Sequence, residues 1–519
     1  MFLKPEAMTL EQKLGMVICA RRFLPEDVTF IKEMVRKHAL GSIQIPPNEP
    51  ELAREILSLA EYPILVAGDS ESGFPVSRLP KVPPISLAAC EKKEYYEAFA
   101  KGNVRDAQAA GFNCTWGPVI DVLDGDRPCA VNRCYSDDPM RVAEVAEVIA
   151  QVYKDNHFLS CGKHFPGVTQ GLPFDTHMTE GICDCTKEEL LQFALVPYQH
   201  LLKKDLLPSA MVAHTVYRNI DPDYPASLSK KVLDIIREMG FDGVMFTDSF
   251  AMMGILQKYG EEKIYGMAIH AGNDIILPNY RTAVKDVYEM LLQNYKDGVF
   301  SEERLNEAVR RVLKAQAFVG TKPEHPTSFT PQDEELLRSV AKDCITAVTD
   351  AGIGAALDGS DRDKLFIVTQ STRTVDASGA EISFGRWYDE NRVAAKIRKE
   401  FPNAGLVFLP EFSQANDHQN VLLEATRYRE VIYITFCNTE AYLGTDCLTR
   451  RTEAVLNALI HSGKVEAVVH FGNPYALKNL LPVKRKIFGY QIQQSQEYAI
   501  DVLKGTLKAK GKLPYNIGS

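Results

Sequence analysis

Short apolar runs alternate with amphipathic helical patterns between residues 40 and 280. The apolar runs predict buried strands, and they are GSIQI (41–45), PILVAGD (63–69), FNCTWGPVID (112–121), LSCGKHF (159–165), SAMVAH (209–214), GVMFTD (243–248) and NDIILP (273–278). Patterns of helical period lie between them. Strand–helix alternation of this kind predicts a parallel sheet. Six or more such units favour a TIM-type (β/α) barrel, and a doubly wound open sheet is the alternative.

A second α/β series follows a break in the pattern. GTKPEHPTSFTPQDEE (320–335) is rich in Pro, Thr and charge, which is typical of a linker. We predict a helix over LLRSVAKDCITAVTDAG (336–352) and then the strands KLFIVTQ (364–370), AGLVFLP (404–410), EVIYITF (430–436), VEAVVHFG (465–472) and KIFGY (486–490). The predicted organisation is a catalytic barrel over 1–320, a linker and connecting helix over 321–345, and an α/β/α sandwich over 346–519.

Composition narrows the classes of function. The 519 residues are 45% apolar and 24% charged, as in soluble globular proteins. The net charge of −9 argues against a nucleic-acid partner, and no apolar stretch is long enough to span a membrane. Eleven scattered cysteines and the lack of a secretory signal favour a cytoplasmic location. No spacing indicates a metal site or a dinucleotide, so we expect no cofactor, and the sequence leaves the oligomeric state open.

Several predicted strands end in polar residues that interrupt an otherwise apolar run. These residues are Asp69, Asp121, the pair Lys163–His164, His214 and Asp248. In parallel barrels the carboxyl ends of the strands meet at one mouth, where barrel enzymes carry out their chemistry. Each such group would cost about 1–3 kcal/mol if it were buried without a partner. One shared polar cavity that binds a polar ligand is the simplest interpretation.

Each of these residues also has a purely structural interpretation. An Asp after a strand often caps the next helix; we favour this interpretation for Asp121 but not for Asp248. His214 has the alternative of a core histidine whose hydrogen bonds are satisfied. Helix capping does not apply to Lys163, so the adjacent pair Lys163–His164 is the firmer indication of a site.

The order of motifs along the chain resembles glycoside hydrolase family 3, in its β-N-acetylhexosaminidase branch. KHFPGVTQGLPFDTH (163–177) is similar to the branch signature K-H-F-P-G-H-G followed by D-S-H. Other segments that resemble family motifs are DSESG (69–73), VNRCYSDDP (131–139), MVAHTVYRNIDPDYPASLS (211–229), GFDGVMFTDSFAMMGI (240–255) and GKLPYNI (511–517).

The resemblance implies a retaining, exo-acting β-N-acetylglucosaminidase that forms a covalent glycosyl-Asp intermediate. Asp248 would be the nucleophile, and His177, paired with Asp175, would be the acid and then the base. The residues expected to bind the terminal sugar are Asp69, Arg133, Lys163, His164 and His214. The substrate would be a small glycoside that contains N-acetylglucosamine, as in cell-wall recycling, and the second domain would not supply the acid.

The residue types suit this chemistry. Retention of configuration needs a nucleophile on one face of the sugar and a proton donor on the other. An ionised Asp can form the ester, and a His, with a pKa of about 6.5 in water, can first donate and then accept a proton. Asp175 and His177 are two residues apart, so an extended segment directs both to the same side. The carboxylate can therefore orient the imidazole, as in catalytic triads.

The segment between these motifs contains Pro166, Gly167, Gly171 and Pro173, which predicts a mobile catalytic loop. Three alternatives to the β-N-acetylglucosaminidase remain open. A phosphorylase of the same family would use phosphate in place of water, and a His donor suits it. A β-glucosidase would take its acid from the second domain, where Glu411 is the candidate. A non-catalytic sugar-binding protein is the alternative of another class.

Overall fold

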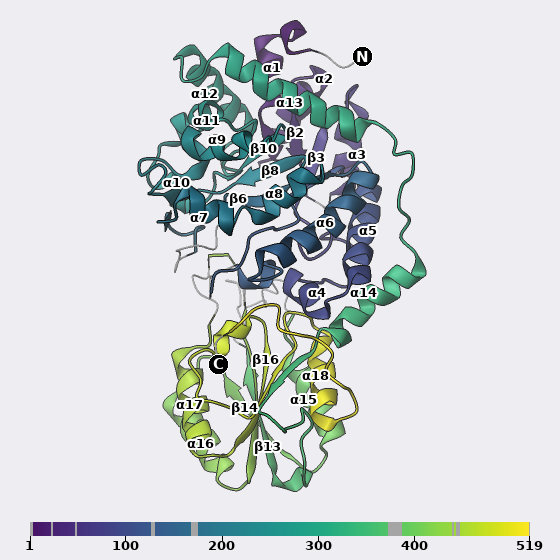
Figure 1. Ribbon diagram of the computed structural model, residues 1–519, viewed down its shortest axis with the longest axis vertical. Helices are drawn as coiled ribbons and strands as arrows, with labels where there is room; N and C mark the ends of the chain where they lie inside the picture. The colour runs from purple at the N-terminus through teal and green to yellow at the C-terminus, as the bar shows by residue number, and fades with distance from the viewer. Residues whose placement is uncertain are drawn as a thin grey trace. The chain divides into compact units, whose positions relative to one another are not determined.

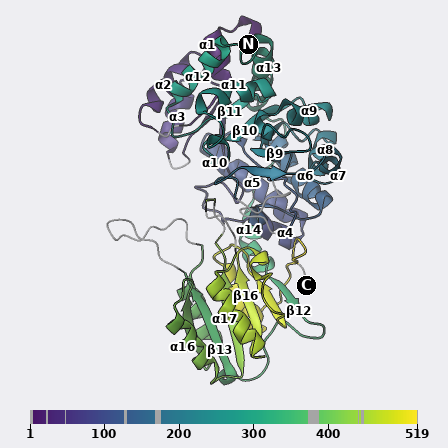
Figure 2. The same cartoon turned by 90° about the vertical axis from the view of Figure 1, so that its left-hand side faces the viewer.

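The structure is a computed structural model, and it describes residues 4–21, 24–46, 49–125, 130–167, 175–371, 387–438, 441–442 and 447–517. The chain forms two compact units (Figures 1 and 2). Unit 1 consists of Met1–Pro80 and Lys93–Glu335, and unit 2 of Lys81–Lys92 and Leu336–Ser519. The domain boundaries proposed from the sequence stay a prediction.

Unit 1 is built on a closed ring of short parallel strands. In the order of the ring they are β1 (Cys19–Arg21), β2 (Ser42–Gln44), β3 (Leu65–Gly68), β4 (Cys114–Thr115), β5 (Leu159–Ser160), β6 (Gly162–Phe165), β8 (Ser209–Val212), β10 (Val244–Ser249) and β11 (Ile275–Leu277). Cys161 separates β5 from β6, which continue one another along the chain. The ring closes where Ile276 bridges Ile18 and its N–H donates to the carbonyl oxygen of Val17 at 2.9 Å. The predicted barrel is confirmed.

Amphipathic helices surround the barrel and one helix lies across its amino end. The surrounding helices include α2 (Asp27–Arg36), α3 (Pro50–Ser58), α5 (Lys93–Ala109), α6 (Pro139–Asp155), α8 (Val196–Lys203), α9 (Lys230–Glu238), α11 (Glu261–Ala271) and α12 (Val284–Lys296). Helix α13 (Glu302–Gly320) begins at the side-chain cap of Ser301 and contacts β3, β5 and β10. Because α13 covers the amino end of the barrel, we expect the functional site at the opposite end, where the strands have their carboxyl ends.

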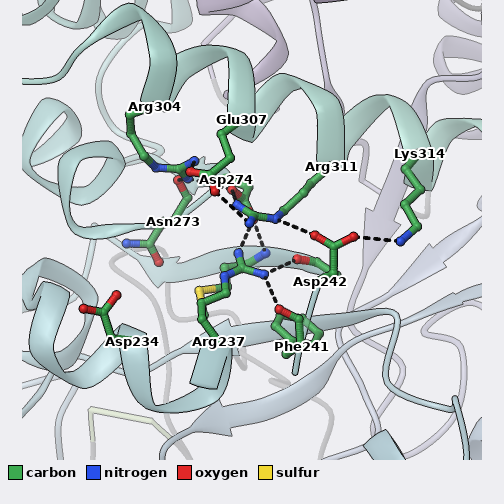
Figure 3. A network of polar contacts seen from close by, with 12 residues as sticks. Asp234, Arg237, Phe241, Asp242, Asn273, Asp274, Arg304, Glu307, Arg311 and Lys314 are labelled. Carbon is green, nitrogen blue, oxygen red and sulfur yellow. Dashed lines mark hydrogen bonds and ion pairs between the residues drawn. The ribbon is translucent and has the colours of Figure 1, made fainter. Parts of the chain in front are cut away.

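A buried carboxylate fixes α13 to the barrel (Figure 3). Asp274, directly before β11, is fully buried and accepts from Arg304 Nη2 at 2.6 Å and Arg237 Nη2 at 2.7 Å. Arg311 Nη1 lies 3.3 Å away, and the N–H of Met245 in β10 also donates to Asp274. Burial lowers the pKa of Arg237, although Asp274 opposes that shift. One carboxylate thus balances guanidinium groups from two helices.

We expect Asp274→Asn to destabilise unit 1 by about 3–5 kcal/mol, because the near-isosteric amide removes the fully buried negative charge that pairs with the half-buried Arg237 and Arg304. The measurement is the denaturant-unfolding transition followed by circular dichroism. Asp242→Asn is the matched control: its carboxylate also pairs with Arg311, but its side chain is 67% exposed. An exposed pair contributes about 0–1 kcal/mol. Equal losses in the two variants would contradict the prediction.

Unit 2 contains one six-stranded sheet in the order β12-β17-β16-β15-β13-β14 among the described residues. Its strands are β12 (Thr346–Thr349), β13 (Lys364–Gln370), β14 (Gly405–Pro410), β15 (Glu430–Phe436), β16 (Val465–Phe471) and β17 (Arg485–Phe488). All pairs are parallel except β12 with β17. Its helices include α4 (Pro84–Cys90), α15 (Glu390–Glu400), α16 (Ala415–Ala425), α17 (Arg450–His461) and α18 (Ser495–Lys504). The predicted α/β/α sandwich is confirmed.

The helix expected over 336–352 is partly wrong. Helix α14 (Pro331–Asp343) ends earlier, and Thr346–Thr349 form β12 instead. The segment TAVT has β-branched residues at alternate positions, which suit a strand once β17 is available as an antiparallel partner. No helix in the described part of the chain is long and apolar enough to cross a membrane.

His470 in β16 makes the stability of unit 2 depend on pH. The side chain is fully buried, and Nε2 donates to the carbonyl oxygen of Asn473 at 2.8 Å. Burial lowers the pKa of His470 to about 3, against about 6.5 in an unfolded chain. Between these two pH values, the imidazole of His470 is therefore protonated in the unfolded chain and neutral in the folded chain.

We therefore expect the contribution of His470 to be fully favourable above pH ~6.5 and to be lost at about 1.4 kcal/mol per pH unit as the pH falls toward 3. His470→Gln keeps an N–H donor but cannot ionise, so its unfolding free energy should fall less steeply between pH 6.5 and 4. Denaturant titrations across this range measure the difference. His461→Gln, at an exposed position in α17, is the control. Parallel curves for wild type and His470→Gln would refute the assignment.

Candidate active site

Asp248 lies near the carboxyl end of β10, at the mouth of the barrel. The side chain is half-buried, and its Oδ1 accepts from the N–H of Ser249 at 2.7 Å. Burial by itself raises the pKa of Asp248. The charges on His164 and His214, together with the Ser249 amide and His177, outweigh burial and hold the pKa below its ordinary value. Asp248 is thus an ionised carboxylate at neutral pH with three histidines in electrostatic range.

His177 is oriented by a buried carboxylate. Oδ1 of Asp175 lies 2.8 Å from His177 Nδ1 and 2.9 Å from its backbone N. Asp175 is buried, whereas the His177 side chain is 27% exposed. The carbonyl oxygen of His177 accepts from the N–H of Met253 at 3.0 Å, and Met253 begins the short helix α10 (Met253–Leu256) just after β10. This bond ties the segment of His177 to the turn that follows Asp248.

A small parallel sheet supports the same segment. The strand β7 (Gly181–Cys183) begins four residues after His177 and pairs with β9 (Thr215–Tyr217), which follows β8 directly. The backbone of Thr176 and Thr179 also lies so close to Gly254 that a Cβ at that position would collide with it. The glycine therefore lets the His177 segment pack against α10.

Lys163 and Arg133 meet at one carboxylate that was not among the predicted site residues, Glu71, and Lys163 also pairs with Asp69. Lys163 Nζ lies 2.7 Å from Asp69 Oδ1 and 2.6 Å from Glu71 Oε1. Arg133 donates twice to Glu71, at 2.8 Å each. Although burial raises the pKa of Glu71, Arg133 and Lys163 hold it well below its ordinary value. The same carboxylates raise the pKa of Lys163 against burial, so both cations stay charged.

Asp121 positions His164, and its interpretation as a helix cap is wrong. No helix follows Asp121 directly in the described residues; the next is the 3-10 helix η2 (Val131–Arg133). Instead, Asp121 Oδ2 lies 2.7 Å from His164 Nδ1, and its Oδ1 accepts from the backbone N–H of His164 at 3.1 Å. Arg133 Nη2 lies 3.2 Å from His164 Nε2. Glu71 and Arg133 thereby join Lys163 to His164, and Asp121 holds His164 from its other ring nitrogen.

His214 lies just after the end of β8, and both of its ring nitrogens have hydrogen-bond partners in other segments. Nδ1 lies 2.8 Å from Ser227 Oγ and Nε2 lies 3.1 Å from the carbonyl oxygen of Ser249. The ring stacks on Phe250 with centroids 5.1 Å apart. Burial lowers the pKa of His214, and Asp248 opposes the shift. Its direct contacts fix the backbone beside Asp248; a contact with a sugar stays a prediction.

The structure thus brings the predicted residues to one end of the barrel, through the contacts described above. Sequence reasoning left two carboxylates out of the predicted site: Glu71, which pairs with Lys163 and Arg133, and Asp121, which pairs with His164. Glu71 had a signal in the segment DSESG, where only Asp69 was chosen, and Asp121 had its place at a strand end. The predicted mobility of the catalytic loop falls mainly on residues 168–174, which lie outside the described residues. No cluster of metal-binding side chains is present in the described residues.

Comparison with known proteins gives a family and a fold. A family profile described as "Glycosyl hydrolase family 3 N terminal domain" matches residues 9–315. A β-hexosaminidase of Shewanella frigidimarina is 33% identical over 174 residues, which are 33% of this chain and 49% of that protein. The chain therefore spans about half the length of that relative.

Two solved structures share the fold over nearly the whole chain. One is a glycoside hydrolase family 3 β-N-acetylglucosaminidase from Paenibacillus sp. str. FPU-7, with a TM-score of 0.80, 21% identity and coverage of 98% of this chain and 99% of that one. The other is the β-glucoside phosphorylase BglX bound to 2FGlc, with a TM-score of 0.81, 20% identity and coverage of 99% and 95%. At this identity the likeness establishes the fold, which an N-acetylglucosaminidase and a phosphorylase share.

Proposed function

The chain belongs to glycosyl hydrolase family 3, a family of glycoside hydrolases, and we propose that it is a retaining, exo-acting β-N-acetylglucosaminidase. Asp248 is the nucleophile, His177 is the acid and then the base, and Asp175 orients His177. The observation that carries this proposal is the Asp175–His177 pair, whose segment is bound through Met253 to the turn after Asp248.

The geometry suits a double displacement. Asp248, ionised because the histidines outweigh its burial, attacks the anomeric carbon and forms an ester while the leaving oxygen takes a proton from His177. Asp175 accepts from Nδ1, so Nε2 is the nitrogen that gives this proton. Water then donates a proton to His177 and its oxygen to the anomeric carbon, which releases Asp248. Asp175 also stabilises the imidazolium, as a triad carboxylate does.

The charged group around Glu71 is the proposed sugar-binding site. Lys163, Asp69 and Arg133 are held by ion pairs before any ligand enters, so little side-chain freedom is lost on binding. Asp69 is exposed and can accept hydrogen bonds from sugar hydroxyls, while Lys163 and Arg133 donate. His164, fixed by Asp121, completes the site. The name of the β-hexosaminidase relative supports a hexosamine as the sugar. N-acetylglucosamine, for instance in cell-wall fragments, is the hexosamine we propose, and the cytoplasmic location stays a prediction.

Phosphorolysis at the same site is the second candidate. A His acid/base carries no negative charge when it is deprotonated, so it does not repel an incoming phosphate as a carboxylate would. One of the solved structures of the same fold is a β-glucoside phosphorylase. Hydrolysis and phosphorolysis share the first step and differ only in the group that attacks the ester.

The test is a panel of aryl β-glycosides, namely the N-acetylglucosaminide, glucoside and xyloside, each with and without phosphate. We expect the N-acetylglucosaminide to react fastest and to give the free sugar in both conditions. A sugar 1-phosphate that forms only with phosphate would assign a phosphorylase. Faster turnover of the glucoside would refute the sugar assignment, and no turnover of any glycoside would favour a sugar-binding protein.

A further inference from the structure

A cavity of about 380 Å³ lies at the amino end of the barrel in unit 1. It is lined by residues at or just before the amino ends of β5, β8 and β10 and by residues of helix α13. Val244, which begins β10, lines the cavity, whereas Asp248 lies near the other end of the same strand. The cavity is therefore separate from the candidate active site, and its volume lies in the range of about 300–1,000 Å³ that small-molecule sites have.

The walls of the cavity are mainly apolar. They include Phe158, Leu206, Leu207, Phe241, Ala315 and Phe318. The three phenylalanines come from three different segments, which are the turn before β5, the turn before β10 and helix α13. Aromatic side chains form favourable stacked or edge-to-face contacts with other rings, in addition to the apolar area that they bury. These walls therefore favour a ligand that contains an aromatic ring.

One buried hydroxyl group in the wall has no partner in the protein. Ser160 in β5 lines the cavity and is only 4% exposed. Its side chain lies on the same side of the strand as Gly162, where a Cβ would lie 2.8 Å from the side chain of Leu207 in the cavity wall. The Ser160 carbonyl accepts from Ser209, but no hydrogen bond joins Ser160 Oγ to any described residue. A ligand with one polar group can supply this missing partner.

The cationic side chains at the cavity already have carboxylate partners. Lys154 Nζ lies 2.7 Å from Asp205 Oδ2. On the side of α13, Asp242 pairs with Lys314 at 3.0 Å and with Arg311 at 3.3 Å (Figure 3). A charged ligand would have to displace one of these partners or place an unpaired charge against apolar walls, which costs free energy. The ion pairs therefore favour an uncharged ligand.

We propose that this cavity binds a small, uncharged aromatic molecule of one or two rings that carries a hydroxyl group. The rings contact Phe158, Phe241 and Phe318, and the hydroxyl group forms a hydrogen bond with Ser160 Oγ. The ion pairs beside the cavity stay intact when the ligand binds. Because the cavity is at the amino end of the barrel, the proposal does not depend on the reaction proposed for the other end.

The experiment titrates 2-naphthol into the full-length chain by isothermal titration calorimetry. We expect one molecule per chain with a Kd of roughly 10⁻⁴ M, an ordinary value for a ligand of this size. Ala315→Phe fills the cavity and should remove binding. Ala317→Phe is the matched control, because Ala317 lies on the same helix but does not line the cavity. Ser160→Ala should raise the Kd by about 5–10-fold, the effect of losing one hydrogen bond.

Hydrogen exchange shows where the probe binds. With 2-naphthol, the amides of residues 205–207 and 240–244 should exchange more slowly, and those of residues 175–183 should not change. 2-Naphthoate, which has the same rings and a negative charge, should bind about 10-fold more weakly or less. The proposal is overturned if the wild type does not bind 2-naphthol, if Ala315→Phe still binds it, or if 2-naphthoate binds as tightly. If Ala315→Phe does not fold, an unchanged Kd for Ser160→Ala overturns it.

Discussion

Asp248→Asn is expected to reduce turnover of an aryl β-N-acetylglucosaminide by roughly 10⁴–10⁶-fold, on the scale of removing the nucleophile of a covalent mechanism. The amide has nearly the shape of the carboxylate and still accepts from the N–H of Ser249, so the fold should persist. An amide does not form the ester at the anomeric carbon. The measurements are kcat and the circular dichroism of the variant.

Two controls make this result specific. Asp242→Asn is the same substitution at an exposed position just before the amino end of β10, and it should keep nearly full activity. In the wild type, a slow 2-fluoro glycoside should leave an ester that maps to Asp248 by mass spectrometry of peptides. Labelling of another carboxylate, or near-normal turnover by Asp248→Asn, would show that Asp248 is not the nucleophile.

His177→Ala is expected to slow the first step by roughly 10²–10⁴-fold for substrates whose leaving group is a sugar alkoxide, the usual contribution of acid–base assistance. An aryl group of low pKa departs without a proton, so its first step should be nearly unchanged. The second step needs the base for either substrate. Azide needs no base, so it should restore turnover and give a glycosyl azide. The measurement is rate against leaving-group pKa for both proteins.

Asp175→Ala should show the same pattern more weakly, because it leaves the imidazole in place without its partner. His200→Ala is the control: His200 also pairs with a carboxylate, Glu147, but on helix α8 outside the site. If the plots of rate against leaving-group pKa have equal slopes for wild type and His177→Ala, and no glycosyl azide forms, His177 is not the acid/base. Glu411 in unit 2 would then be the next candidate.

The sequence by itself predicted the strands around which both units form. Each apolar run that predicted a strand contains an observed one, because a strand buried on both faces has an uninterrupted apolar sequence. The strands β7 and β9 of the small sheet were missed, and so were the short strands β1 and β12 of the two main sheets. Their residues are stabilised by partners far along the chain, Ser42–Gln44 for β1 and β17 for β12, and a local pattern does not contain that information.

The sequence also determined which residue types meet at the barrel mouth, since polar residues at the ends of parallel strands converge there whatever the details of packing. Only the tertiary structure decided how they are joined. Asp121 looked like a helix cap, but a strand 43 positions away places His164 against it. Glu71 became the shared partner of Lys163 and Arg133 because separate segments of the barrel bring each of these cations within 3 Å of its carboxylate. Contacts of this range depend on how the barrel closes, which no local pattern in the chain encodes.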